Sequence, residues 1–195
     1  MDEGSIKFNC NWIKAEPASS KHIKELNIWR DKLYNLGLIG ADKNGIGFGN
    51  ISIRFEKHAF IITGSATGGL NKLSESHYVL VNEYDLLQNS LICTGPIKAS
   101  SESLSHAVIY ECSPETNAVM HIHNIDMWEK LMHKAPSTSD NVSYGTPEMA
   151  NEIKRLFNET PVAVEKILVM SGHKEGIIAF GSTLDEAGKI IISKL

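Results

Sequence analysis

The chain has few cysteines and no long hydrophobic run. Its three cysteines, Cys10, Cys93 and Cys112, are odd in number and form no CxxC pair among 195 residues. They therefore suggest neither a cysteine zinc knuckle nor a disulfide framework, and they favour a reducing compartment. No apolar stretch approaches the roughly 20 residues that span a bilayer, and a start containing Asp2 and Glu3 lacks a signal-peptide pattern. We therefore expect a cytoplasmic protein with no membrane partner.

Acidic residues also outnumber basic residues in the chain. The chain has 19 Lys and Arg against 23 Asp and Glu, a net charge of -4. Nucleic acids and anionic membranes bind proteins through a basic face, so neither is expected as a partner, and a small anionic ligand must be bound locally. The length and the 42% of hydrophobic residues fit one globular domain. We expect an N-terminal arm over residues 1–20, irregular and without chemistry of its own, and a single domain over residues 21–195.

Strand and helix patterns alternate along the chain, which predicts an α/β fold. Strands are expected at residues 51–55, 59–63, 78–82, 91–94, 118–123, 167–170 and 177–180, and helices at residues 21–36, about 102–112, 125–132, 147–157 and 184–195. Helix starts are marked by Thr146 followed by Pro147, and by Thr183 with Glu186 as a capping box.

The run Ala118–Asn124 ends in a His-x-His motif. Alternate side chains of a strand share a face, so His121 and His123 are expected to point to the same side. His173 also follows a strongly apolar strand, and three histidines with one exchangeable position are what a catalytic zinc needs. A strand end with two polar residues that happen to be histidine is the alternative for the motif alone.

Two glycine-rich loops accompany neighbouring strands, at residues 45–50 and 64–69. Taken alone the first is a hairpin turn, but together the loops resemble a cradle for a ligand. Ser100 or Ser101 is expected to cap the next helix, whose free N–H groups favour an anion. Glu102 then lies in the first turn, either as a functional carboxylate or as a helix-start acid that the helix dipole favours. His106 is expected to be packed.

The order of these motifs resembles the class II aldolase and adducin head family over residues 21–192. The motifs are Gly-Asn-Ile-Ser, Ile-Thr-Gly, Ser-Ser-Glu before a helix, His-x-His, Tyr-Gly-Thr before a helix, and Gly-His followed by Gly-Ile-Ile. The resemblance implies a three-layer α/β/α fold with a largely antiparallel central sheet, and a homo-oligomer, expected to be a tetramer.

The resemblance also assigns roles. His121, His123 and His173 resemble the family's zinc ligands, for which another divalent transition metal is an alternative, and Glu102 resembles its acid/base. The residues that resemble the family's phosphate site are Gly49, Asn50, Thr67, Gly68, Ser100 and Ser101. The implied function is a zinc-dependent lyase that cleaves a small hydroxy-carbonyl substrate, such as a sugar phosphate, through an enediolate.

Three departures keep other functions open. The family's aldolases have a tyrosine four residues before Gly-Thr, where this chain has Asn141, with Tyr144 just before Gly145. The third ligand is followed by Lys174 and Glu175 rather than directly by glycine, and the chain stops at Leu195 without the aldolases' C-terminal extension. The alternatives are a non-catalytic adducin-like binding or scaffold domain, and an epimerase or dehydratase that uses the same metal.

Overall fold

The centre of the protein is an eight-stranded sheet, seen in a computed structural model that describes residues 4–17 and 20–195. The strand order is β1-β7-β6-β5-β4-β8-β10-β9. All neighbours are antiparallel except β1 and β7, which confirms the expected largely antiparallel sheet. The strands are β1 (Asn9–Lys14), β4 (Asn50–Glu56), β5 (Ala59–Thr63), β6 (Tyr78–Asp85), β7 (Ser90–Gly95), β8 (Ala118–His123), β9 (Ile167–Val169) and β10 (Gly176–Gly181).

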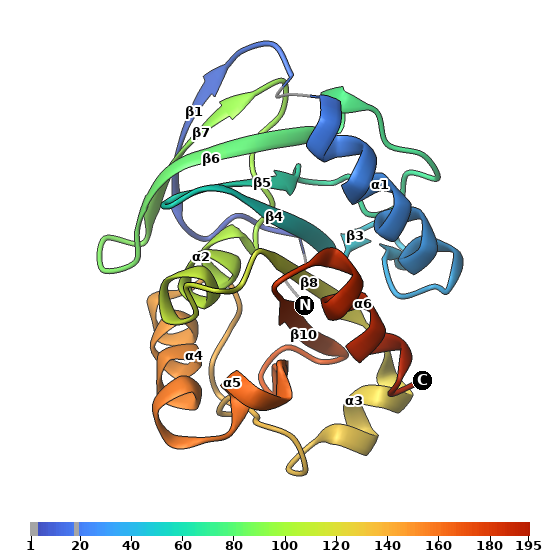
Figure 1. Ribbon diagram of the computed structural model, residues 1–195, viewed down its shortest axis with the longest axis vertical. Coiled ribbons are helices and arrows are strands. Elements are labelled where there is room, and N and C mark those ends of the chain that lie inside the picture. Colours follow the sequence, from blue (N-terminus) through green and yellow to red (C-terminus); the bar gives the residue numbers. More distant parts are fainter. Residues whose placement is uncertain (1–3, 18–19) are drawn as a thin grey trace.

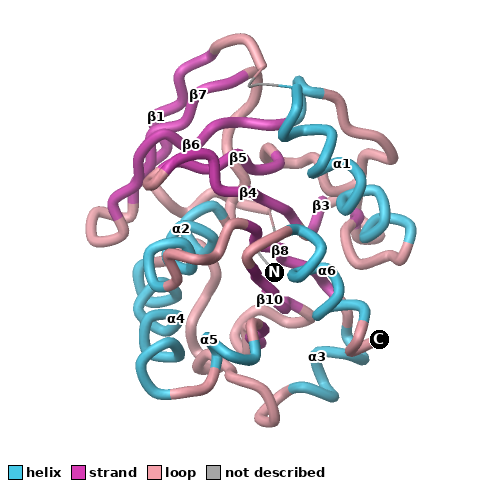
Figure 2. The backbone as a smooth tube through the Cα atoms, viewed as in Figure 1, coloured by secondary structure: helices cyan, strands magenta, loops and turns pink. Residues whose placement is uncertain are grey.

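Helices cover both faces of the sheet, which confirms the α/β/α layers (Figure 1). One layer holds α1 (Ser20–Asn35), α3 (Ile125–Leu131) and α6 (Leu184–Ile192), and the other holds α2 (Ser103–Cys112), α4 (Pro147–Glu159) and α5 (Val162–Glu165). Figure 2 shows strands β4, β8 and β10 running between these two groups of helices. Of the helices in the described part of the chain, none has the length and apolarity to cross a membrane.

Strand β8 is buried on both faces, and its alternation assigns each side chain to one layer. Met120 and Ile122 pack in the core cluster under α1 and α6, whereas Val119 packs in the cluster under α2 and α4. His121 and His123 therefore share one face of the strand, as the His-x-His spacing predicted, and this face is turned to the layer of α2 and α4.

The seven predicted strands and five predicted helices are all present, with ends within three residues of expectation. Thr146 caps α4 by accepting from the Met149 N–H (3.3 Å), and Thr183 caps α6 by accepting from the Glu186 N–H (3.1 Å). The capping box is incomplete, because the carboxylate of Glu186 accepts from the N–H of Ser182 and not from that of the cap residue.

The prediction of an irregular N-terminal arm was wrong. Residues Asn9–Lys14 form β1, which extends the sheet by pairing in parallel with β7. Its side chains alternate only weakly between half-buried and exposed because it is an edge strand. The structure also contains short elements that periodicity does not reveal, namely β2 (Gly40–Ala41), β3 (Gly47–Phe48), the 3₁₀ helix η1 (Glu75–His77) and α5.

Candidate metal centre and active site

Three histidines meet where β8 ends. His121 and His123 project from β8, and His173 lies in the turn that leads from β9 to β10. Their ligating atoms all lie within 4.8 Å of one another, and the Nε2 atoms of His123 and His173 are 3.1 Å apart. The structure thus brings together the three histidines that the sequence singled out.

Burial keeps these imidazoles neutral. Burial lowers the pKa of His121 well below its ordinary value, and the neighbouring His123 and His173 lower it further. Burial also lowers the pKa of His123 to about 4 and, with the charges of His123 and Lys7, that of His173 to about 3. At neutral pH each ring therefore offers a lone pair, which is the form that binds a metal.

The residues fit a divalent transition metal. The Nε2 atom of His121 is buried and has no hydrogen-bond partner among the described residues, which is costly unless another group binds it. Two nitrogen ligands about 2.1 Å from a tetrahedral zinc lie about 3.4 Å apart, so the observed spacing needs only small side-chain movements. Three protein ligands leave a fourth position for water or substrate, as in catalytic zinc sites.

Asn50 is placed to orient His121. The two residues are directly opposite in the β4–β8 pair, and Asn50 Nδ2 lies 3.4 Å from His121 Nδ1. The other amide atom, Asn50 Oδ1, is buried without a partner among the described residues. A half-turn of the amide would let Oδ1 accept from the Nδ1–H of His121, which leaves the Nε2 lone pair for a metal and turns Nδ2 away.

Two glycines allow His173 to approach the other ligands. A Cβ atom on Gly172 would lie 2.2 Å from the carbonyl oxygen of Val142, so only glycine fits there. A Cβ on Gly176 would lie 2.6 Å from Cδ2 of His173 and 3.3 Å from Nε2 of His121. The two extra residues after His173 are accommodated by a turn in which the N–H of Gly176 donates to the carbonyl of His173 (2.9 Å).

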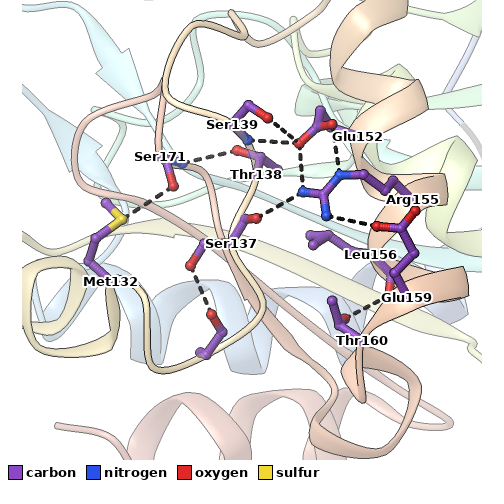
Figure 3. A network of polar contacts seen from close by, with 11 residues as sticks. Met132, Ser137, Thr138, Ser139, Glu152, Arg155, Leu156, Glu159, Thr160 and Ser171 are labelled. Carbon is purple, nitrogen blue, oxygen red and sulfur yellow. Dashed lines mark hydrogen bonds and ion pairs between the residues drawn. The ribbon is translucent and has the colours of Figure 1, made fainter.

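A network from α4 supports this turn (Figure 3). Glu152 and Arg155 form an ion pair (2.8 Å), and they bond to the loop 137–139 through Ser139 and the carbonyl of Ser137. From the same loop, the hydroxyl of Thr138 accepts from the N–H of Ser171 (3.0 Å), two residues before the third histidine. The position of that histidine is therefore tied to α4.

Glu102 occupies the N-cap position of α2, without a side-chain capping hydrogen bond, rather than lying in the first turn. The predicted cap, Ser100 or Ser101, was wrong because the carbonyl of Ser100 accepts from the N–H of Ser103 (3.1 Å) in a turn that precedes the helix. The Glu102 carboxylate is 2% exposed, with Oε1 3.6 Å from His173 Nε2 and Oε2 accepting from the Ser105 hydroxyl (3.1 Å). The carboxylate thus lies beside the histidine cluster.

A small pocket lies next to this cluster, where the sequence predicted a cradle. The pocket is lined by all six predicted residues, Gly49, Asn50, Thr67, Gly68, Ser100 and Ser101, together with Glu102 and His121. Fewer backbone N–H groups are free to bind an anion than expected. Those of Glu102 and Ser103 donate instead to the hydroxyl and the carbonyl of Ser100. The hydroxyl of Thr67 is also engaged, as it donates to the carbonyl of Gly64 (2.8 Å).

Arg30 supports the cradle from behind, and the sequence analysis missed it. This arginine of α1 is 1% exposed and donates to the carbonyls of Thr67 (3.1 Å), Gly68 (2.9 Å) and Asn71 (3.1 Å). It lies four residues after Leu26, on the face of α1 where helical spacing demands an apolar side chain. A charge in that position was the signal that could have identified it.

Two aromatic rings flank the histidines. Phe48 stacks on His123 (5.1 Å between ring centroids), and Tyr144 packs against His173 (4.7 Å). Tyr144 is buried, whereas Asn141, at the position of the family's tyrosine, is exposed. The chain thus places a tyrosine beside the third ligand, three residues later than the pattern of the aldolases.

The N-terminal arm reaches the same place. Gly4 lines the cradle pocket, the N–H of Ser5 donates to the Tyr144 hydroxyl (3.2 Å), and Lys7 Nζ lies 4.1 Å from the centroid of the Tyr144 ring. None of these contacts was predicted, since the arm has no motif and its approach depends on β1.

His106 is packed, as predicted. It is fully buried, burial lowers its pKa to about 3, and its Nδ1 lies 2.7 Å from the hydroxyl of Ser52. That hydroxyl is also 2.8 Å from the hydroxyl of Tyr110, so His106 belongs to a buried polar group under α2.

One curated protein is similar to this chain over most of its length. A 5-methylthioribulose-1-phosphate/5-deoxyribulose-1-phosphate aldolase of Escherichia coli O45:K1 is 27% identical over 154 residues, which cover 71% of this chain and 65% of that protein. The match therefore spans about two thirds of the length of that relative.

Solved structures share the fold. An L-fuculose-1-phosphate aldolase from Thermus thermophilus has a TM-score of 0.64 at 20% identity, with 90% of both chains covered. A sugar-phosphate aldolase from Thermotoga maritima has a TM-score of 0.64 at 18% identity, with 89% of this chain and 90% of that chain covered. The family model of the Class II Aldolase and Adducin N-terminal domain matches residues 38–193. The chain therefore belongs to the class II aldolase and adducin N-terminal domain family.

Proposed function

We propose that this protein is a zinc-dependent lyase that cleaves a small hydroxy-carbonyl compound, a sugar phosphate or a related phosphorylated sugar acid, by a reverse aldol reaction. The observation that carries the proposal is the juxtaposition of three neutral histidines, one buried carboxylate and a small glycine-lined pocket. The names of the relatives, which are sugar-phosphate aldolases, support it.

His121, His123 and His173 would hold the metal. A divalent ion there would supply Lewis-acid stabilisation of the negative charge that develops on substrate oxygens when a carbon–carbon bond breaks. The chain's own contribution is to keep the three rings neutral through burial and to leave a ligand position open.

Glu102 would move the protons. Cleavage requires that the hydroxyl on the departing carbon lose a proton as its C–O bond becomes a carbonyl, and that the carbon left electron-rich gain one. A carboxylate beside the histidine cluster can accept the first proton and return it in the second step, so it ends the cycle unchanged. The hydroxyl of Ser105 fixes one oxygen of that carboxylate and leaves the other toward His173.

The cradle would hold the phosphate. Its walls are backbone and small polar side chains from the loops at residues 47–50 and 64–68 and from the turn before α2. On Gly68 a Cβ would lie 2.6 Å from the carbonyl of Gly40, so the loops pack backbone to backbone and Arg30 braces them. Such a site would bind an oxyanion through the loop N–H groups that remain free and through the side chains of Asn50, Ser100 and Ser101.

A substrate screen tests the proposal. Zinc-loaded protein is assayed with ketose phosphates and phosphorylated aldonates by release of the aldehyde fragment, and Glu102→Gln is compared with Glu115→Gln, which removes an exposed carboxylate. Loss of the acid/base should lower the rate about 10²–10⁴-fold, with the control unchanged. Equal turnover by wild type and Glu102→Gln would show that Glu102 is only a helix-start acid. No turnover on any substrate, with loss of folding on chelation, would favour an adducin-like binding domain.

We further propose that the protein is a cytoplasmic homotetramer. Support for the tetramer comes from the family to which the chain belongs. Light scattering at micromolar concentration measures the mass directly, and a monomer would refute this assembly.

A further inference from the structure

The N-terminal arm is anchored beside the active site. Phe8 is buried in the core under α2 and α4, and the N–H of Asn9 donates to the carbonyl of Asn89 (2.9 Å). The side-chain amide of Asn89 donates in turn to the carbonyl of Lys7 (3.0 Å). The backbone of Lys7 is therefore held by the sheet, and its side chain is presented from a fixed point.

The ammonium of Lys7 lacks a carboxylate partner within the described part of the chain. The side chain is half-buried, its Nζ lies over the Tyr144 ring, and no carboxylate of the described residues is within 4.0 Å of it. A cation–π contact at such a site contributes little by itself. A half-buried ammonium in this position is suited to bind an anion that comes from outside the chain.

Lys7 and the cradle lie beside different histidines of the cluster. The cradle adjoins His121 and Glu102, whereas Lys7 lies over the tyrosine ring that packs on His173. The described lining of the cradle contains no Lys or Arg side chain, and Lys7 is the only Lys or Arg whose charge acts on the pKa of a described cluster histidine. A substrate that holds its phosphate in the cradle beside His121 and extends past the cluster to His173 would bring its other end near Lys7.

We propose that Lys7 binds a carboxylate at the end of the substrate remote from the phosphate, and that it is a specificity-determining residue. This inference rests on the proposed function and narrows its substrate class to phosphorylated sugar acids. An ammonium has three donors, and a charge-assisted bond to a carboxylate is stronger than one to a hydroxyl.

Calorimetric binding of two matched probes tests this role without turnover. Ribonate 5-phosphate and ribitol 5-phosphate share a five-carbon skeleton and differ in having a carboxylate or a CH₂OH at the far end. Zinc-loaded wild type should bind the carboxylate probe about tenfold more tightly or better, as expected for a hydrogen bond to a charged group. Lys7→Met should abolish that preference while leaving the affinity for ribitol 5-phosphate within about twofold.

Two control variants distinguish the effect of losing the Lys7 charge from an effect on folding. Lys7→Arg should retain most of the preference, and Lys14→Met, which removes an exposed charge from β1, should behave as wild type. The inference is overturned if wild type shows no preference, or if Lys7→Met keeps it. If ribitol 5-phosphate binds wild type but not His121→Ala, the proposed site stands whatever Lys7 does. Equal binding of that probe to both would instead contradict the proposed function.

Discussion

The histidine cluster and the loop network of Figure 3 adjoin one another, yet they differ in how completely their polar atoms are paired. In the network, both oxygens of Glu152 and all three nitrogens of Arg155 have partners. In the cluster, His121 Nε2 is buried without a partner among the described residues. Native proteins satisfy most buried polar atoms, so an unpartnered imidazole nitrogen inside a histidine cluster is a candidate position for a ligand. Asp31, Asn89 and His106, outside the cluster, also keep a buried atom without a hydrogen-bond partner in the described part of the chain, so it is the meeting of three histidines that distinguishes the site.

Removal of one ligand should have the largest effect on this comparison. His121→Ala should reduce the metal content from about one ion per chain to near zero and abolish activity, because two histidines do not hold zinc in a catalytic site. Elemental analysis after dialysis measures the metal, with the exposed His58→Ala as the matched control. Equal metal in wild type and His121→Ala would show that the cluster is not the site.

On acidification, the histidine cluster should lose its contribution to stability at a higher pH than the loop network. An unfolded histidine has a pKa near 6.5, whereas the folded pKa values of His123 and His173 are about 4 and about 3, so at intermediate pH the unfolded chain binds more protons. The contribution of these histidines to the free energy of unfolding of the metal-free protein should be fully present above about pH 6.5 and should decrease toward about pH 4. For each histidine the decrease should be at most about 1.4 kcal/mol per pH unit.

Urea unfolding in chelator at several pH values measures this slope, which should be shallower in His173→Gln and unchanged in His58→Gln. The network behaves differently, because hydrogen bonds from Arg155 hold the pKa of Glu152 at about 2 and its contribution persists to about pH 4.5. A stability that stays constant from pH 7 to pH 5 would contradict the lowered pKa values.

Asn50 offers a finer test, because it belongs to both the cluster and the cradle. Asn50→Leu should weaken zinc binding by about 10–100-fold, since His121 loses the acceptor that orients it. Asn50→Asp keeps an acceptor for Nδ1–H and should keep zinc affinity, but its charge should raise KM for a phosphorylated substrate. Competition with a chromogenic chelator measures zinc affinity, with the exposed Asn151→Leu as control. Zinc affinities that are equal in Asn50→Leu and wild type would remove Asn50 from this role.

The smallest effect is expected from removing the hydrogen bond between Thr138 and Ser171, which links the loop network to the turn of His173. Thr138→Val removes the acceptor of the Ser171 N–H and should cost about 1 kcal/mol of unfolding free energy. Because Gly172 also fixes the turn, zinc affinity should fall less than about tenfold. Ser139 lies in the same loop but makes no hydrogen bond to Ser171. Ser139→Ala should therefore lower the unfolding free energy, measured by urea unfolding, by less than Thr138→Val does. A larger loss in Ser139→Ala would show that the network stabilises the loop and not the turn.

Much of the fold was predictable because its elements have regular periods. The strand of residues 118–123 and the helix after Thr146 were predicted to within two residues from alternation and capping. The strand β1 was not predicted, because an edge strand at residues 9–14 has no continuous apolar face. The cap of α2 was misplaced by the competition among the consecutive polar residues Ser100, Ser101 and Glu102 for one helix start.

The side chains that form the candidate site could be named from the sequence. His-x-His spacing assigns His121 and His123 to one face of a strand, and the motif order identified the family and the six cradle residues. The residues that support them could be found only in the folded chain. Arg30 reaches the cradle from α1, Thr138 reaches the turn of His173, and Lys7 reaches Tyr144 from beside an edge strand. Such contacts join residues distant in the chain, and no local period encodes them, because they depend on how whole elements pack.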